Sequence, residues 1–208
     1  DRMLSLIQQG AFGDLPEGMD EAIAIMIRSN KNLLDMVNML LEVYRYEAGR
    51  KTLSMIPVSL CELLAEVLQG LSPIAMDAGL ELRSNLDEFQ DKQIVVIGDR
   101  LELHRVFTNL IGNAVKFTES GSVTVHLSAK PDRAVIAIQD TGTGIPPEQL
   151  DLLFQPFWSG KHKRSGSGLG LPLAQQIVTA HSGSIQIESE VGKGSTFTIE
   201  LPLEQAAL

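Results

Sequence analysis

Residues 109–116 read Asn-Leu-Ile-Gly-Asn-Ala-Val-Lys, and the interpretation of the whole sequence depends on this stretch. Asn109, Asn113 and Lys116 stand at positions i, i+4 and i+7, so a helix places all three on one face. A second set of residues recurs at steps of three and four and is apolar: Leu103, Phe107, Leu110, Ala114 and Phe117. The pattern predicts a helix from about residue 100 to 117 that buries one side and presents polar ligands on another.

The composition is that of an ordinary globular protein of 208 residues, with 44% hydrophobic and 21% charged residues. The formal net charge of −9 argues against a nucleic-acid partner, although a local basic cluster can still bind an anionic small ligand. No run of about 18 apolar residues is present, so we predict no membrane contact. The single cysteine, Cys61, favours a cytoplasmic location for this part of the protein, whether or not a longer chain is anchored in a membrane.

The expected organisation is a helical hairpin over residues 1–50 followed by an α+β domain over residues 51–208. In the hairpin, we predict a short helix at residues 1–9, a Gly- and Pro-rich loop at 10–18 and a long helix at 19–48. The apolar stripe of the long helix is too wide for the short helix to cover, which predicts a second subunit packed on it. Because the chain begins without Met inside a predicted helix, we interpret it as a fragment of a longer protein.

Alternating strands and amphipathic helices begin at about residue 51. Strands are expected at residues 52–58, 80–86, 93–97, 122–129, 133–139, 184–189 and 195–201. Helices are expected at residues 60–78, 100–117 and 171–182. Together they predict a two-layer α/β sandwich in which helices cover one face of a mixed sheet.

Three groups of residues in this second part carry candidate chemistry, and the first is the polar face with Asn109, Asn113 and Lys116. Carboxamide oxygens suit Mg²⁺, which takes oxygen ligands and keeps some of its waters when it bridges phosphates. The ammonium group would add a point charge for a phosphate. The alternative is a buried helix whose asparagines bond to loop backbone, and the helix alone does not decide between the two.

The second group, Asp140-Thr-Gly142-Thr-Gly144-Ile145, directly follows a predicted strand. A carboxylate at a strand's end can accept a hydrogen bond from an exocyclic amine, and the glycines let a flat ring approach the backbone. The alternative is an Asp-led turn whose glycines adopt positive φ.

The third group, Gly166-Ser-Gly168-Leu169-Gly170, opens the last predicted helix. Free N–H groups and the dipole at a helix N-terminus favour phosphate, whereas the alternative is a flexible loop and cap. The GxGxG spacing and the absence of a preceding strand exclude a dinucleotide-binding fold. A basic run just before this group would alone be a solvated loop, but next to a phosphate site it is expected to contact the terminal phosphate: Lys161, Lys163 and Arg164.

Together and in this order, the three groups resemble the histidine-kinase-type ATP-binding domain. Sensor histidine kinases, gyrase-type topoisomerases, Hsp90 chaperones and MutL proteins share that domain. The resemblance covers about residues 55–203. The sequence motifs of the family, called boxes, match at these residues: N box 104–118, G1 box 140–145, F box 154–157, G2 box 166–171 and the segment after it at 192–197. Sensor histidine kinases match best, because residues 40–49 resemble the end of their second dimerisation helix.

The resemblance implies a Bergerat-type ATP-binding fold with ATP and Mg²⁺ as cofactors. It implies that Asp140 reads the adenine amine, that Asn113 binds Mg²⁺ and that Lys116 contacts phosphate. It also places these residues at the nucleotide: Gly142, Gly144, Ile145, Lys161, Lys163, Arg164, Gly166, Gly168, Leu169, Gly170 and Thr196. Residues from about 141 to 166 would form a mobile lid over ATP.

Asn109 separates the chemistries within this superfamily. In its ATPases, the position four residues before the Mg²⁺ asparagine is a glutamate that activates water, whereas a carboxamide is not a general base. Asn109 therefore favours transfer of the γ-phosphoryl group to a protein nucleophile, driven by positioning and charge neutralisation. The function we expect is the catalytic part of a two-component sensor histidine kinase, with Asn109 and Lys116 as catalytic residues. Its expected partners are a second copy, through the hairpin, and the receiver domain of a response regulator.

The chain departs from the family at its phosphoacceptor. The acceptor histidine stands in a His-Glu/Asp-Leu-Arg-x-x-Pro setting, which none of the four histidines has: His104, His126, His162 and His181. We therefore expect that the acceptor lies outside this chain and that the fragment does not autophosphorylate. One alternative is a degenerate nucleotide-binding or dimerisation module without kinase activity. Another, a gyrase- or Hsp90-like ATPase, is disfavoured by Asn109 and by the hairpin.

Overall fold

The computed structural model describes residues 2–8, 11, 13, 19–89, 94–158 and 167–204. The helices are α1 (Arg2–Gln8), α2 (Met19–Glu47), α3 (Leu60–Asp77), the 3₁₀ helix η1 (Leu86–Phe89), α4 (Arg100–Phe117), α5 (Pro147–Leu150) and α6 (Gly170–Ala180). The strands are β1 (Ile56–Ser59), β2 (Glu81–Ser84), β3 (Val95–Gly98), β4 (Ser122–Ala129), β5 (Arg133–Asp140), β6 (Ser184–Glu190) and β7 (Gly194–Pro202).

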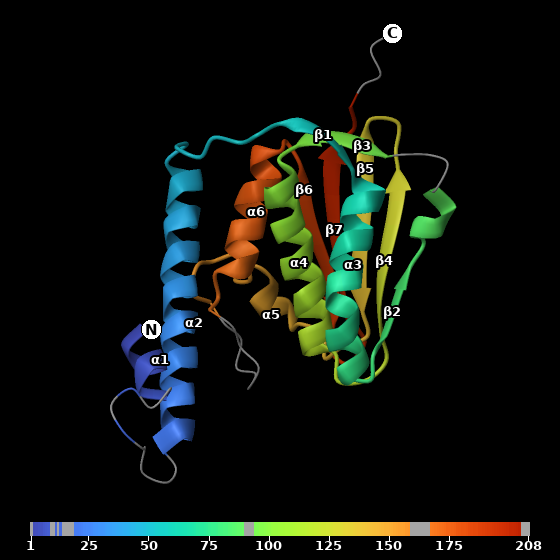
Figure 1. The fold of residues 1–208 in the computed structure, drawn as a ribbon. Helices are drawn as coiled ribbons and strands as arrows, with labels where there is room; N and C mark the ends of the chain where they lie inside the picture. Colours follow the sequence, from blue (N-terminus) through green and yellow to red (C-terminus); the bar gives the residue numbers. More distant parts are fainter. Residues whose placement is uncertain are drawn as a thin grey trace.

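Five strands form a mixed sheet in the order β2-β4-β5-β7-β6, in which only the β2–β4 pair is parallel. The strands β1 and β3 make a separate antiparallel pair. Helices α3, α4 and α6 lie in one layer over one face of the larger sheet, and α2 stands beside this sandwich, next to α6 (Figure 1). The predicted two-layer α/β sandwich with a mixed sheet is confirmed.

Helix α4 has the predicted bounds because both of its local signals are strong. The Asp99 carboxylate caps it by accepting hydrogen bonds from the N–H groups of Leu101 and Glu102, at 3.1 and 3.2 Å. Four residues of the predicted apolar face are buried: Leu103, Phe107, Leu110 and Ala114. The fifth, Phe117, lines a cavity at the end of the helix. Burying such side chains contributes about 1.5–3 kcal/mol each, which fixes the rotation of the polar face.

Alternation along the central strands places the core between the sheet and the helices. On β4, Val123, Val125 and Leu127 are fully buried, whereas His126 is exposed on the opposite face. Strands β5 and β7 alternate in the same way and bury Ile136, Ile138 and Ile199, among other residues. The two faces of the sheet therefore differ, and one of them is left to solvent.

The structure shortens two predicted strands. The strand expected at residues 52–58 is only Ile56–Ser59, because its partner β3 has four residues and pairs from Gly98 to Val95. The backbone N–H of Ser54 instead donates to the Asp99 carboxylate, at 2.9 Å. The strand expected at 80–86 ends at residue 84 and is followed by η1. Strand length here depends on distant partners.

Helix α2 leaves most of its apolar side chains uncovered. Only Ile23 and Val43 are buried on it. Its exposed large apolar residues are Met19, Ile25, Met26, Leu33, Leu34, Met36, Val37, Leu41 and Tyr44. The apolar stripe of α2 is too wide for the described part of the chain to cover. Its burial by a second subunit stays a prediction. Within the described ranges, no helix is both long and apolar enough to cross a membrane.

Candidate functional site

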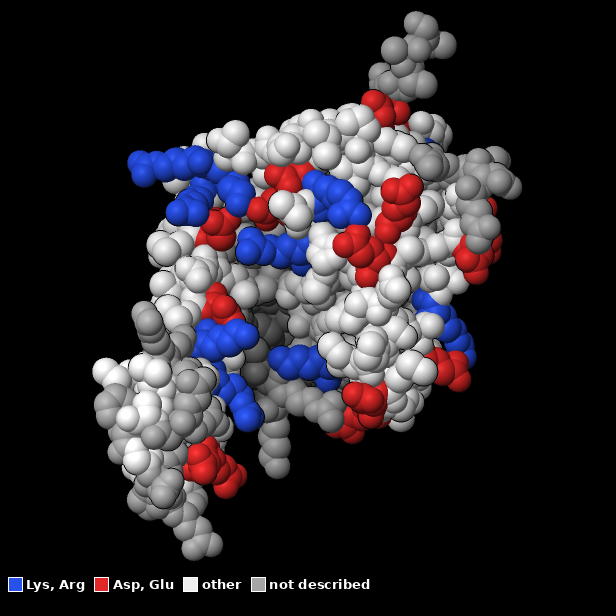
Figure 2. Space-filling model, viewed as in Figure 1, with Lys and Arg blue, Asp and Glu red and all other residues white. Residues whose placement is uncertain are grey.

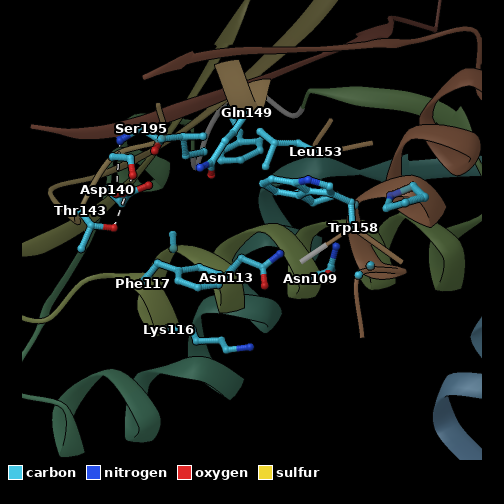
Figure 3. Close-up of a pocket in the computed structure, with 18 of the residues that line it drawn as sticks. Asn109, Asn113, Lys116, Phe117, Asp140, Thr143, Gln149, Leu153, Trp158 and Ser195 are labelled. Atoms are coloured by element: carbon cyan, nitrogen blue, oxygen red, sulfur yellow. Dashed lines mark hydrogen bonds between the residues drawn. The ribbon is translucent and has the colours of Figure 1, made fainter. Parts of the chain in front are cut away.

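A cavity of about 330 Å³ opens between α4, the end of β5, α5 and the start of α6 (Figure 3). Eight of the predicted site residues line it: Asn109, Asn113, Lys116, Asp140, Gly144, Ile145, Gly168 and Gly170. They come from the three separate groups of the sequence, which the fold brings to one place. Figure 2 shows Lys and Arg side chains on both sides of a hollow in the viewed face, although the chain is acidic overall.

Asp140 forms one end of the cavity. It is buried, with 6% of its surface exposed, and its Oδ1 accepts the N–H of Gly142 at 2.8 Å and that of Ser195 at 3.3 Å. Burial raises the pKa of this carboxyl, and the two N–H donors oppose the shift. Within the described residues no donor reaches Oδ2, so this oxygen can accept a hydrogen bond from a bound molecule.

The glycines after Asp140 are required by the chain's own packing. A Cβ on Gly142 would lie 2.5 Å from the Phe117 carbonyl oxygen, and one on Gly144 would lie 2.1 Å from that of Glu190. Gly144 also has φ of +66°, which side chains rarely adopt. Gly144 lines the cavity and Gly142 does not. The turn is therefore present, and approach of a ligand to the backbone at Gly144 stays a prediction.

The polar face of α4 forms the opposite edge. In Figure 3, Asn109 and Asn113 stand side by side at the cavity, with Lys116 one turn further along the helix. The Nδ2 of Asn109 is buried without a hydrogen-bond partner in the described part of the chain. Burial lowers the pKa of Lys116, whose Nζ lies 5.3 Å from the centre of the Phe117 ring. An anion at this edge would restore the ammonium's lost solvation.

Helix α6 points its N-terminus at the cavity. It begins at Gly170 after the N-cap Leu169, whose side chain makes no capping bond, so the N–H groups of Gly170 and Leu171 remain available to an anion, whereas Pro172 has no N–H. A Cβ on Gly170 would lie 2.4 Å from Asn109 Oδ1, which shows how closely α6 approaches α4. Leu169 itself is fully buried and lies outside the lining. Gly168 lines the cavity at φ of +68°.

Thr196 does not line the cavity, whereas its neighbours Ser195 and Phe197 do, so its contact with a nucleotide stays a prediction. Successive side chains of a strand point to opposite faces, and Thr196 on β7 belongs to the face away from the helices. The predicted residues Lys161, Lys163, Arg164 and Gly166 lie outside the described residues.

Sequence reasoning missed several residues of the lining: Met39, Thr143, Gln149, Leu153, Trp158 and Ser195. Only Ser195 carried a usable signal, because strand alternation from the buried Phe197 places it on the same face. Met39 comes from α2, and its sulfur lies 3.9 Å from the Ser167 hydroxyl at the cavity's edge. No local pattern indicates a contact between parts of the chain so far apart.

Residues 98–205, just over half of the chain, match the family described as histidine kinase-, DNA gyrase B-, and HSP90-like ATPase. The chain belongs to this family. Its ordered groups around one cavity are those of a histidine kinase ATP-binding catalytic domain, and its sandwich is the Bergerat fold of such domains.

Similar proteins of known name support this family assignment. The circadian input-output histidine kinase CikA of Synechococcus elongatus is 38% identical over 205 residues, which cover 96% of this chain and 27% of that protein. The signal transduction histidine-protein kinase BarA of Escherichia coli is 38% identical over 85% of this chain and 20% of its own length. Full-length ShkA, solved in complex with AMPPNP, is 29% identical with a TM-score of 0.83, covering 99% of this chain and 42% of ShkA. The chain therefore spans about a fifth to a quarter of these curated relatives.

Proposed function

We propose that this chain is the catalytic part of a two-component sensor histidine kinase. It binds Mg-ATP and transfers the γ-phosphoryl group to a histidine on a dimerisation helix, for relay to an aspartate of a response regulator. Residues 1–50 belong to the dimerisation hairpin and residues 51–208 to the ATP-binding domain. The observation that carries the proposal is the arrangement of Asp140 at one end of a single cavity and Asn113, Lys116 and the α6 N-terminus at the other.

The polarity of the cavity fits ATP from end to end. The unoccupied lone pairs of Asp140 Oδ2 suit the exocyclic amine of adenine. The uncapped start of α6 and the ammonium of Lys116 suit the phosphates. The basic run Lys161, Lys163 and Arg164 is proposed to contact the terminal phosphate.

The residues at the phosphate edge also fit Mg²⁺ in the form that accompanies a nucleotide. The described residues contain no cluster of three or more His, Cys, Asp or Glu that could hold a metal ion by itself. Asn113 offers one neutral oxygen ligand. The buried Nδ2 of Asn109 has no partner among the described residues, and as a donor it suits a phosphate or water oxygen around the ion and not the ion itself. Mg²⁺ uses few protein ligands when phosphates and water supply the others, and it would neutralise phosphate charge there.

Asn109 is the reason to propose a kinase and not a fast ATPase. Its carboxamide cannot take a proton from water, and among the described residues Asp140, at the far end, is the only carboxylate that lines the cavity. The chain's own contribution is to hold the nucleotide and stabilise its charge while an external histidine attacks. In a protein that also carries the acceptor helix, homodimerisation through the uncovered stripe of α2 would bring such a histidine into the assembly.

Calorimetric titration with a non-hydrolysable ATP analogue and Mg²⁺ tests the proposal. We expect the native chain to bind and Asp140→Ala to lose most of the affinity. His126→Ala, on the exposed face of the sheet, serves as the matched control and should bind normally. No binding by the native chain, or undiminished binding by the Asp140 variant, would contradict the assignment.

A second measurement separates a kinase from a degenerate binding module. A separate dimerisation domain that carries the acceptor histidine is supplied together with γ-labelled ATP. Transfer of the label to that histidine is the expected result. Absence of transfer with ATP demonstrably bound would favour the degenerate module, and steady phosphate release would favour an ATPase.

A further inference from the structure

Ser189 on β6 is bonded to two other segments at the Asp140 end of the cavity, the loop with Ile145 and the start of β7. Its Oγ accepts the backbone N–H of Ile145 at 2.8 Å and lies 3.0 Å from the Gly194 carbonyl oxygen. It also lies 2.9 Å from the hydroxyl of Ser195. Ser189 does not line the cavity itself, whereas Ser195 does. Any effect of Ser189 on a ligand must therefore pass through another residue.

The direction of each hydrogen bond at Ser189 is fixed by the chemistry of its partners. A carbonyl oxygen can only accept, so the single hydroxyl proton of Ser189 goes to Gly194. The N–H of Ile145 can only donate, and it occupies one lone pair of Ser189 Oγ. The remaining lone pair faces Ser195, so in this bond Ser195 is the donor. All donor and acceptor positions of Ser189 are then used.

This arrangement determines what Ser195 can offer to a ligand. Because its only hydroxyl proton is committed to Ser189, its oxygen presents lone pairs to the cavity and cannot donate. The backbone N–H of Ser195 is bonded to Asp140 Oδ1, so the two side chains stand together at one end of the cavity (Figure 3). Both Ser195 Oγ and Asp140 Oδ2 act as hydrogen-bond acceptors at this end.

We propose that Ser189 is a positioning residue that sets base specificity: it holds Ser195 as an acceptor, so that the site rejects purines with a carbonyl at position 6. This inference rests on the proposed binding of ATP and adds a specificity determinant to that site. An adenine amine has two protons, which suit two acceptors, either directly or through one water. A hypoxanthine or guanine keeps a donor at N1 for Asp140, but its O6 meets the lone pairs of Ser195.

Binding of three Mg-nucleotides with different groups at position 6 tests the proposal: ATP, purine riboside triphosphate and inosine triphosphate, of which the last also carries a proton at N1. The native chain should bind them with affinity falling in that order. In Ser189→Ala, the Ser195 hydroxyl can rotate and donate to O6 of inosine. The ratio of the ATP affinity to the inosine triphosphate affinity should therefore fall about tenfold, which corresponds to about one hydrogen bond. Equal weakening of all three nucleotides would show a merely structural role and overturn the proposal.

Two further variants test whether Ser189 acts through Ser195. Ser195→Ala removes the hydroxyl, so adding Ser189→Ala to it should leave the affinity ratio unchanged. A tenfold further change in this double variant would overturn the proposal. Ser189→Thr keeps the hydroxyl and should retain the native ratio, whereas a ratio like that of Ser189→Ala would also overturn it. Failure of the native chain to bind ATP would refute the proposed function, whereas an unchanged ratio in Ser189→Ala with ATP bound would refute only this inference.

Discussion

Replacement of Lys51 by Met should destabilise the fold, because Lys51 ties α2 to α4. Its Nζ lies 2.6 Å from Glu42 Oε2 on α2 and 2.7 Å from Glu102 Oε1 on α4. Removing the ammonium leaves two carboxylates close together. Two arginines compensate in part: Arg45 lies 2.8 Å from Glu42, and Arg105 lies 3.9 Å from Glu42 and 3.5 Å from Glu102.

The expected loss of stability follows from how far the three charged side chains are buried. An exposed ion pair contributes about 0–1 kcal/mol, and breaking a fully buried one costs about 3–5 kcal/mol. The side chains of Lys51, Glu42 and Glu102 are 22%, 14% and 11% exposed, which places the cluster between these limits. We expect the free energy of unfolding to fall by about 2 kcal/mol, which lowers Tm by about 4–8 °C in a chain of this size.

The loss should depend on pH in a defined direction. The hydrogen bond from Lys51 is the largest cause that lowers the pKa of Glu42 below its ordinary value of 4.5, and burial opposes it. A carboxyl with a lowered pKa stabilises the fold above the ordinary value, and this contribution disappears as the pH falls through the lowered one. The difference between the native chain and Lys51→Met should therefore be full near pH 7 and shrink below about pH 4.5.

Urea unfolding at pH 7 and at acid pH measures both effects. Lys31→Met, at an exposed site on α2, is the matched control and should change stability by less than about 0.5 kcal/mol. The double variant Lys51→Met with Glu102→Gln should recover part of the loss, because it removes one of the stranded carboxylates. A loss equal to that of the control, or one that does not vary with pH, would refute the assignment of the cluster.

Three other predictions concern the cavity and its walls. Asp140→Asn should weaken ATP binding about tenfold to hundredfold, because the charged carboxylate that accepts a hydrogen bond from the nucleotide is replaced by a neutral amide. In the native chain, ATP binding measured by calorimetry should weaken as the pH falls through the raised pKa of Asp140. Trp158 is the only tryptophan and lines the cavity, so its fluorescence should change on addition of ATP and saturate with the calorimetric affinity. Gly144→Ala should lower the free energy of unfolding by about 2 kcal/mol or more, because its Cβ would lie 2.1 Å from a carbonyl oxygen at positive φ. Gly70→Ala, in open space on α3, should leave stability equal or higher, and equal losses in both variants would contradict the packing argument.

The sequence predicts those helices and strands whose limits depend on residues within the same segment. Helix α4 was predictable to the residue because its apolar period and its Asp99 cap lie within the segment itself. The strand expected at residues 52–58 starts later than predicted because its start is set by pairing with β3, where Gly98 lies more than forty residues further along the chain than Ile56. The motif around residues 192–197 indicates which segment lies near the cavity, but it does not show that Ser195 lines the cavity and Thr196 does not, because neighbouring residues of a strand point to opposite faces. Met39 lines the cavity because α2 packs beside it, and no local pattern in the sequence predicts this contact.

Asn109 gives a sharp test of the proposal that this site transfers a phosphoryl group and does not hydrolyse ATP rapidly. Its Oδ1 would lie only 2.4 Å from a Cβ on Gly170, so the start of α6 closes over this side chain. Asn109→Glu supplies the carboxylate that water activation needs, but the longer side chain must displace α6 and adds negative charge beside the phosphates. We expect about a tenfold or greater loss of ATP affinity, by analogy with an uncompensated charge, and no steady phosphate release. Asn109→Asp keeps the native size and separates the charge from the crowding. Normal ATP binding and steady phosphate release by Asn109→Glu would contradict this crowding argument. In that case the lack of a carboxylate at position 109 would by itself explain slow hydrolysis.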